Sequence, residues 1–120
     1  MGNLTEHFSS VEFQCGDGCG LCTIDLQLVQ QLEGARRLLG RPIHITSGVR
    51  CPAHNARVGG ARESAHMLGL AADLACPTPY DRYDLLMALL TMSFRRIGIG
   101  KDFLHVDIDR TKPTDLCWLY

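Results

Sequence analysis

The sequence lacks features on which several classes of protein depend. It has no run of basic residues and no basic residues interleaved with aromatic ones, and its 12 Lys and Arg are balanced by 13 Asp and Glu. Nucleic-acid binding therefore has no support. No apolar stretch approaches the ~18 residues of a membrane span. Residues 1–6 contain neither the charged nor the apolar region of a secretory signal peptide. We therefore expect a protein without a membrane span that is made in the cytoplasm.

The sequence also lacks internal repeats, low-complexity segments and linkers. With 120 residues, of which 46% are hydrophobic, it has the length and composition of one globular domain with a modest core. We expect residues 1–120 to form a single domain and to be monomeric.

Apolar spacing and turn residues predict an α+β fold. The expected helices are a short one near the capping box at 9–12, a longer one over 25–39 that ends at Gly40, a helical turn over 52–58 and a helix from 78–79 to about 92. The expected strands are 42–47, 70–74, 95–99 and 104–109. This order is typical of a small, mostly antiparallel sheet with helices packed on one face.

Two histidines and one aspartate form a candidate metal site: His66, Asp73 and His105. A catalytic zinc ion needs three protein ligands and one open position. His66 and Asp73 are too far apart on a straight helix (roughly 10 Å) or on a continuous strand (~23 Å) to share an ion. The chain must therefore bend between them, and Gly69 lies where the bend is needed.

These residues also carry a resemblance to a known family. The matching positions are Ser64-x-His66-x-x-Gly69-x-Ala71-x-Asp73 and Asp102-x-x-His105, with further similar stretches at 43–52, 54–60 and 97–100. The pattern resembles the zinc D-Ala-D-Ala carboxypeptidase family, of the M15 type. That family includes peptidoglycan D,D-peptidases and phage endolysins that cut L-Ala-D-Glu bonds. The similarity extends from about Phe8 to Ile108.

The resemblance implies a role for each matched residue. His66, Asp73 and His105 are expected to bind the catalytic zinc ion. Arg50 is expected to stabilise the oxyanion and to take part in substrate binding with Ser64. Asp102 is expected to be the catalytic base.

The residues themselves leave other roles open. Arg50 could form an ordinary ion pair, Ser64 could cap the helical turn that leads to His66, and Asp102 could be a turn residue. Asp107 is the rival base, because it lies two residues after His105 and so on the same face of a strand. It could instead accept a hydrogen bond from a ligand histidine.

The resemblance implies a zinc-dependent metallopeptidase that hydrolyses peptidoglycan stem peptides. It would be a D-Ala-D-Ala carboxypeptidase or an L-Ala-D-Glu endopeptidase that acts on the cell wall once it is released, as in phage lysis. The alternative is a non-catalytic cell-wall binding module that retains zinc. Hedgehog signalling domains, which share this fold, keep the metal in a non-degradative protein, so the fold alone does not prove catalysis.

Cysteine is abundant, with six residues in the chain. Four of them, Cys15, Cys19, Cys22 and Cys51, could hold a second, structural zinc ion, since glycines at 16, 18 and 20 permit tight turns. Disulfides and free thiols are the alternatives. Cys76 follows the strand that carries Asp73 and is expected to be buried.

Overall fold

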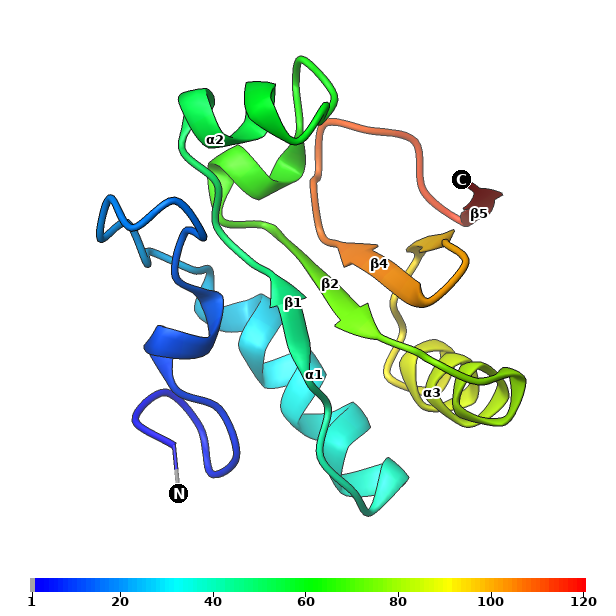
Figure 1. Ribbon diagram of the computed structural model, residues 1–120. Helices are drawn as coiled ribbons and strands as arrows, with labels where there is room; N and C mark the ends of the chain where they lie inside the picture. The colour runs from blue at the N-terminus through cyan, green and yellow to red at the C-terminus, as the bar shows by residue number, and fades with distance from the viewer. Residues whose placement is uncertain (1) are drawn as a thin grey trace.

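The computed structural model describes residues 2–120, which form one five-stranded sheet flanked by helices (Figure 1). The elements, in chain order and with η for a 3-10 helix, are η1 (Ser10–Phe13), α1 (Leu26–Leu39), β1 (Ile45–Ser47), α2 (Pro52–Arg57), η2 (Ala65–Leu68), β2 (Ala71–Ala75), α3 (Pro79–Thr91), β3 (Arg96–Ile99), β4 (Phe103–Asp107) and β5 (Leu116–Leu119). Each helix and strand expected from the sequence is present, although β1 is shorter than the predicted strand over 42–47.

The sheet has the strand order β1-β2-β4-β3-β5. The pairs β1/β2, β2/β4 and β3/β4 are antiparallel, whereas β3 and β5 are parallel. The predicted α+β fold with a mostly antiparallel sheet is therefore confirmed. The sequence did not predict β5, because most of this edge strand is exposed and shows no buried alternation.

The two long helices begin and end at the residues that the sequence indicated. The Asp25 carboxylate caps α1 by accepting a 2.8 Å hydrogen bond from the backbone N–H of Gln27. Gly40 ends α1 with a left-handed φ of 75°, a conformation that glycine adopts without steric cost. At the start of α3, Thr78 Oγ1 accepts a bond from the backbone N–H of Asp81, and Pro79 occupies the first turn.

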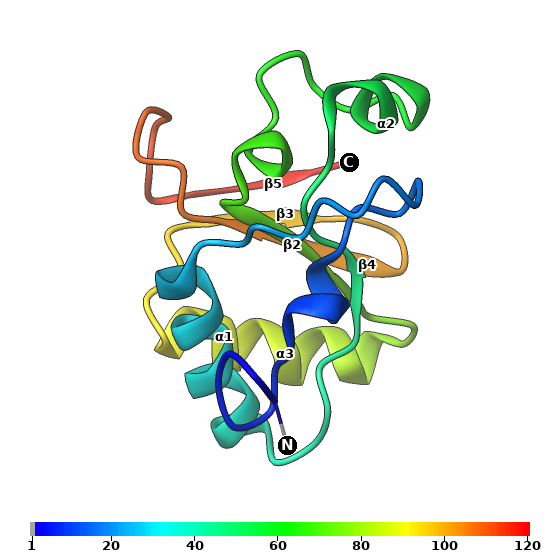
Figure 2. The same cartoon turned by 90° about the vertical axis from the view of Figure 1, so that its left-hand side faces the viewer.

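Strand alternation divides the sheet into a core face and a site face. Figure 2 shows α1 and α3 on one side of the sheet, with α2 and η2 on the other. The core beneath the two long helices receives Ala72, Leu74, Leu104 and Val106 from β2 and β4. The residues between them, Asp73, His105 and Asp107, therefore point to the opposite face. The alternation of side chains along β2 and β4 thus separates the residues that pack in the core from those of the candidate site.

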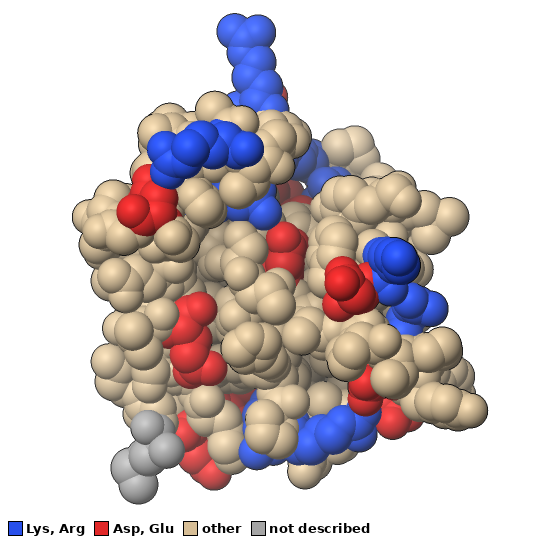
Figure 3. All heavy atoms as spheres, viewed as in Figure 1, with Lys and Arg blue, Asp and Glu red and all other residues tan. Residues whose placement is uncertain are grey.

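Within residues 2–120, no helix has both the length and the apolar character needed to cross a membrane. Figure 3 shows Lys and Arg side chains interspersed with Asp and Glu on one face of the molecule. That face has no extended basic patch of the kind that binds a phosphate backbone.

Candidate metal centre

His66, Asp73 and His105 come together because the chain turns sharply and two strands pair. His66 lies in η2, and Gly69 ends that helix with a left-handed φ of 70° before β2 begins. A side chain on Gly69 would collide with the carbonyl oxygen of Thr23, so both the turn and the close packing require glycine. Asp73 in β2 is paired directly with His105 in β4. The predicted bend at Gly69 is thus present.

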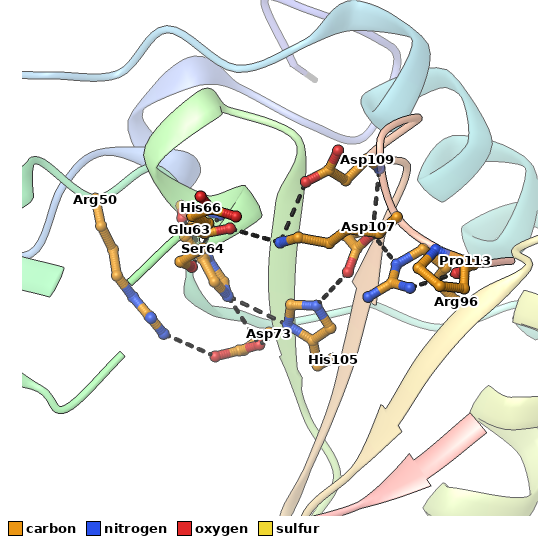
Figure 4. Close-up of polar contacts among 12 residues, drawn as sticks. Arg50, Glu63, Ser64, His66, Asp73, Arg96, His105, Asp107, Asp109 and Pro113 are labelled. Atoms are coloured by element: carbon orange, nitrogen blue, oxygen red, sulfur yellow. Dashed lines mark hydrogen bonds and ion pairs between the residues drawn. The ribbon is translucent and has the colours of Figure 1, made fainter. Parts of the chain in front are cut away.

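The donor atoms of these three residues converge on one point (Figure 4). His66 Nε2 lies 3.3 Å from His105 Nδ1 and 3.3 Å from Asp73 Oδ1. His105 Nδ1 lies 2.9 Å from the same carboxylate oxygen. Tetrahedral zinc with bonds of ~2.0–2.1 Å to nitrogen and oxygen holds its ligand atoms about 3.3 Å apart. Two of the three separations match this spacing, and the one between His105 and Asp73 is a few tenths of an ångström shorter, so the three side chains fit a zinc ion after a small adjustment.

A further partner orients each of the three donor groups. His66 Nδ1 lies 2.7 Å from the carbonyl oxygen of Gly48, and His105 Nε2 lies 2.8 Å from Asp107 Oδ2. Since both partners are acceptors, these nitrogens carry the hydrogens, and the lone pairs of the other two nitrogens face the metal position. Asp73 is held in turn by Arg50 Nη2, which donates to its second oxygen at 3.2 Å. Such contacts preorganise a metal site before the ion arrives.

The two aspartates and His105 also perturb one another's pKa values in the ion-free protein. Burial raises the pKa of Asp73, but hydrogen bonds with His105 and His66 outweigh burial and hold it well below the usual range. Burial lowers the pKa of His105, but bonds with Asp107 and Asp73 outweigh it and raise the pKa. Burial likewise opposes the low pKa of Asp107, which bonds with His105 and Arg96 produce. The site is therefore an anionic pocket around an imidazole, and a cation can replace the imidazole proton.

Arg50 lies beside the metal position with its guanidinium held by three partners. Its Nε donates to Ser47 Oγ at 3.1 Å and its Nη1 to Asn55 Oδ1 at 3.3 Å, in addition to the bond to Asp73. A guanidinium has five N–H donors. Two of them are therefore left to bind a group in the neighbouring cavity.

The metal position opens into a cavity of about 440 Å³, a size typical of small-ligand sites. Its wall includes Ser64, which is buried and whose hydroxyl accepts a 3.2 Å hydrogen bond from the backbone N–H of His66. Ser64 thus has the capping role that was open from the sequence, and its position in the wall also allows contact with a substrate.

The structure places the two candidate bases differently. Asp107 lines the cavity, but one of its oxygens contacts His105 and the other accepts a 2.7 Å bond from Arg96 Nε. Asp102 is exposed in the turn between β3 and β4 and is not part of the cavity wall. The contacts of Asp107 match the role of a hydrogen-bond acceptor for a ligand histidine. The role of Asp102 as base stays a prediction.

The cavity wall also contains polar and aromatic residues that were not predicted from the sequence, among them Arg96, Lys112, Trp118 and Tyr120. Arg96 lies over the Trp118 ring, with its guanidinium carbon 5.0 Å from the ring centre. Trp118 and Tyr120 are two residues apart, which is the strand signal that could have placed both on one face. That signal is only one repeat long, and the parallel pairing of β5 with β3 brings it to the site.

A second group of donor atoms lies outside this cavity. Cys15, Cys19 and Cys51 are grouped with Asp17, and their donor atoms all lie within 4.8 Å of one another. Cys22, which the sequence placed with the other three cysteines, is not in this group, and Asp17 takes its position. All six cysteines are free thiols, so the disulfide alternative finds no support within residues 2–120. Cys76 is buried as expected.

Comparisons with known proteins agree with this geometry. A family model described as Peptidase M15 matches residues 6–109, which include all three candidate zinc ligands and most of the chain. A search of curated proteins gave no match. The matched span, the order His66, Asp73, His105 and the convergence of their donor atoms lead to one conclusion. The chain belongs to the M15 family of zinc peptidases.

Proposed function

We propose that the protein is a zinc-dependent peptidase that hydrolyses peptide bonds in peptidoglycan stem peptides. The observation that carries the proposal is a convergent set of three protein donors, each oriented by another residue, at the wall of an open cavity. A site with three protein ligands and one open position is typical of catalytic zinc, whereas structural zinc sites are closed by four. Zinc, when bound there, polarises a carbonyl group and makes water a better nucleophile.

The charges around the cavity support a substrate with carboxylate groups. Arg50, Arg96 and Lys112 line it, although Asp107 occupies Arg96 Nε and Asp109 pairs with Lys112 at 3.2 Å. Arg50 keeps two N–H donors that can form parallel bonds to a carboxylate or an oxyanion. Stem peptides present carboxylates at their C-terminal D-Ala and at D-Glu. The D-Ala-D-Ala and L-Ala-D-Glu bonds are therefore both candidates for cleavage.

Arg50, Asp107 and Asp102 have different roles in the proposed reaction. Arg50, held by Ser47 and Asn55, is placed to stabilise negative charge on the scissile carbonyl oxygen. Asp107 fixes the orientation of the His105 ring and so keeps Nδ1 directed at the metal position. By resemblance, Asp102 takes the proton from the attacking water. Action on the cell wall would follow release from the cytoplasm, as in phage lysis.

One observation favours a second candidate, a zinc-retaining module that binds cell-wall peptides without turnover. Of the described carboxylates, those that line the cavity are Asp73 and Asp107, and both are engaged by other side chains. Neither is free to act as a base, and Asp102 is exposed outside the cavity wall. Affinity for stem peptides without cleavage would be the signature of this alternative.

Incubating the zinc-loaded protein with muropeptides and reading the products by mass spectrometry separates the two candidates. We expect either loss of the terminal D-Ala or separation of L-Ala from D-Glu, and His66→Ala should abolish the cleavage. If zinc-loaded protein binds the muropeptides but leaves them intact, the peptidase proposal is wrong and the binding module is correct.

A further inference from the structure

A second set of metal-binding side chains lies between the N-terminal loop and the start of α2. Cys15, Asp17 and Cys19 come from that loop, and Cys51 is the residue before α2. None of them lines the cavity of the candidate metal centre. The group joins positions 36 residues apart, since the backbone N–H of Cys51 lies 3.4 Å from Cys15 Sγ. Such a long-range cluster of thiols is not explained by the peptidase site.

Asp17 lies at the centre of this group. Its Oδ1 is 3.2 Å from Cys15 Sγ, and its Oδ2 is 3.0 Å from Cys51 Sγ. In tetrahedral zinc, with Zn–S bonds of ~2.3 Å and Zn–O bonds of ~2.0 Å, sulfur and oxygen ligands lie about 3.5 Å apart. Both contacts are a few tenths of an ångström shorter than this, and one donor atom from each of the four residues lies within 4.8 Å of the others, so the group can close around one ion after small outward shifts.

The loop is shaped to present these atoms together. Cys15 N donates to the carbonyl oxygen of Leu21 at 2.7 Å, which closes the loop. Gly18 and Gly20 adopt left-handed φ angles of 79° and 86°, which side chains rarely tolerate. The backbone N–H of Cys19 donates to Asp17 Oδ1 at 3.0 Å and so orients the carboxylate. Cys22 follows this closure and lies outside the group of donors.

The surroundings also suit an ion with thiolate ligands. The backbone N–H of His54 lies 3.4 Å from Cys51 Sγ, and N–H donors of this kind stabilise metal-bound sulfur. Three thiolates and one carboxylate around Zn²⁺ leave two negative charges. Arg57 offsets one of them, because its Nη2 lies 3.0 Å from Asp17 Oδ2. Sulfur-rich tetrahedral sets select zinc over harder cations such as Mg²⁺ and Ca²⁺.

We infer that Cys15, Asp17, Cys19 and Cys51 form a structural zinc site, closed by four protein ligands. The site joins the N-terminal loop to the segment that supplies two contacts of the peptidase centre. Within that segment, Gly48 holds His66 and Arg50 holds Asp73. Cys51 directly follows Arg50, so an ion on Cys51 restrains the backbone on which the guanidinium depends. Its loss should loosen this segment without removing a ligand of the catalytic ion.

Counting metal in a variant that has lost the catalytic site tests this inference independently of activity. After dialysis, the full-length wild type should hold two zinc equivalents and His66→Ala should hold one. Adding Cys51→Ser, or the exposed Cys19→Ser, should remove that remaining equivalent, whereas adding Cys117→Ser should not. Circular dichroism establishes that each variant is folded. If His66→Ala is misfolded, the single variant Cys19→Ser replaces it in the test. We then expect two zinc equivalents in the wild type and one in Cys19→Ser.

The fourth ligand is tested by a matched pair of variants in the same His66→Ala background. Asp17→Ala should weaken zinc binding by about tenfold or more, since even a residue that only supports a ligand contributes 10–100-fold. Cys22→Ser should leave the affinity unchanged. The reverse result would overturn the assignment of Asp17 and return Cys22 to the site.

Cobalt substitution identifies the ligand type directly. His66→Ala loaded with Co²⁺ should show the near-ultraviolet sulfur-to-cobalt charge-transfer absorption of a thiolate site, and Cys51→Ser should lose it. Three results would overturn the inference: a folded His66→Ala protein that binds no metal, a cobalt spectrum without this absorption, or a mass that reveals a disulfide among these cysteines. None of them would contradict the peptidase proposal, which rests on other residues.

Discussion

Asp73 and His105 face each other directly across the antiparallel pair β2/β4, and Asp73 Oδ1 lies 2.9 Å from His105 Nδ1. Strand pairing therefore places two of the three candidate zinc donors, and the turn at Gly69 brings His66 to them. Donors built on paired strands are positioned more precisely than donors on loops, because backbone hydrogen bonds hold the strands together.

The first prediction concerns Asp107, which accepts a hydrogen bond from His105 Nε2. Asp107→Asn keeps an oxygen acceptor but loses the charge that faces His105 and Arg96. We expect zinc affinity to fall 10–100-fold, with turnover restored at saturating zinc. Competition with a chromophoric chelator measures the affinity. A variant that binds zinc normally but has no activity would make Asp107 the base.

The second prediction concerns Asp102, the base implied by the resemblance. Asp102→Asn should retain zinc and lower kcat by ~10²–10⁴-fold, the usual contribution of general-base catalysis. Asp84→Asn is the matched control, since Asp84 is an exposed aspartate paired with Arg41. Near-normal turnover in Asp102→Asn would remove Asp102 from the mechanism and agree with its exposure outside the cavity wall.

The third prediction concerns the guanidinium of Arg50. Arg50→Lys keeps the charge but cannot form the parallel bonds of a planar fork. Zinc content should be unchanged while kcat falls ~10²-fold or more, the scale for removing one oxyanion donor. Arg41→Lys, which alters an exposed pair, serves as control. If KM rises with kcat intact, Arg50 anchors a substrate carboxylate instead, and a carboxypeptidase is favoured.

The fourth prediction concerns Trp118 in the cavity wall. Trp118→Ala removes the ring that stacks near Arg96 and His105. We expect KM for muropeptides to rise roughly 2–10-fold, since an aromatic contact contributes ~0.5–1.5 kcal/mol, and zinc content to be unchanged. Leu119→Ala is the control, because Leu119 is exposed on the same strand and outside the cavity wall. If the two variants raise KM equally, the Trp118 ring does not contact the substrate, and β5 contributes to the site only through its backbone.

The fifth prediction concerns the pH dependence of stability through Glu33. Burial raises the pKa of this carboxyl, but hydrogen bonds from the His7 ring and the His7 backbone N–H outweigh burial and lower it to about 2. Because the folded-state pKa is lowered, the stabilisation is present above the unfolded value of 4.5 and is lost as the pH falls towards 2.

Glu33→Gln should therefore destabilise the protein by roughly 1.5–3 kcal/mol at pH 7, the scale of hydrogen bonds to a charged group. Urea unfolding of wild type and variant across the acid range measures the difference. The difference in free energy of unfolding between wild type and variant should become smaller as the pH falls. A difference that does not depend on pH would show that the charge of Glu33 is not its cause.

The sequence by itself determined the features that depend on neighbouring residues or on a short period. The caps at Asp25 and Thr78 act over a few residues, and Gly69 meets a steric demand for a left-handed turn. The alternation in β4 placed His105 and Asp107 on one face. These features are readable because their causes lie within a few positions of each other.

The tertiary structure alone decided the features that depend on contacts between distant segments. It determined that His105 offers Nδ1 and directs Nε2 to Asp107. It brought Trp118 into the cavity wall through the parallel pairing of β5. It also placed Asp17, and not Cys22, beside Cys51. Side-chain direction across a long sequence separation follows from how the whole chain packs, and no local pattern of residue types encodes it.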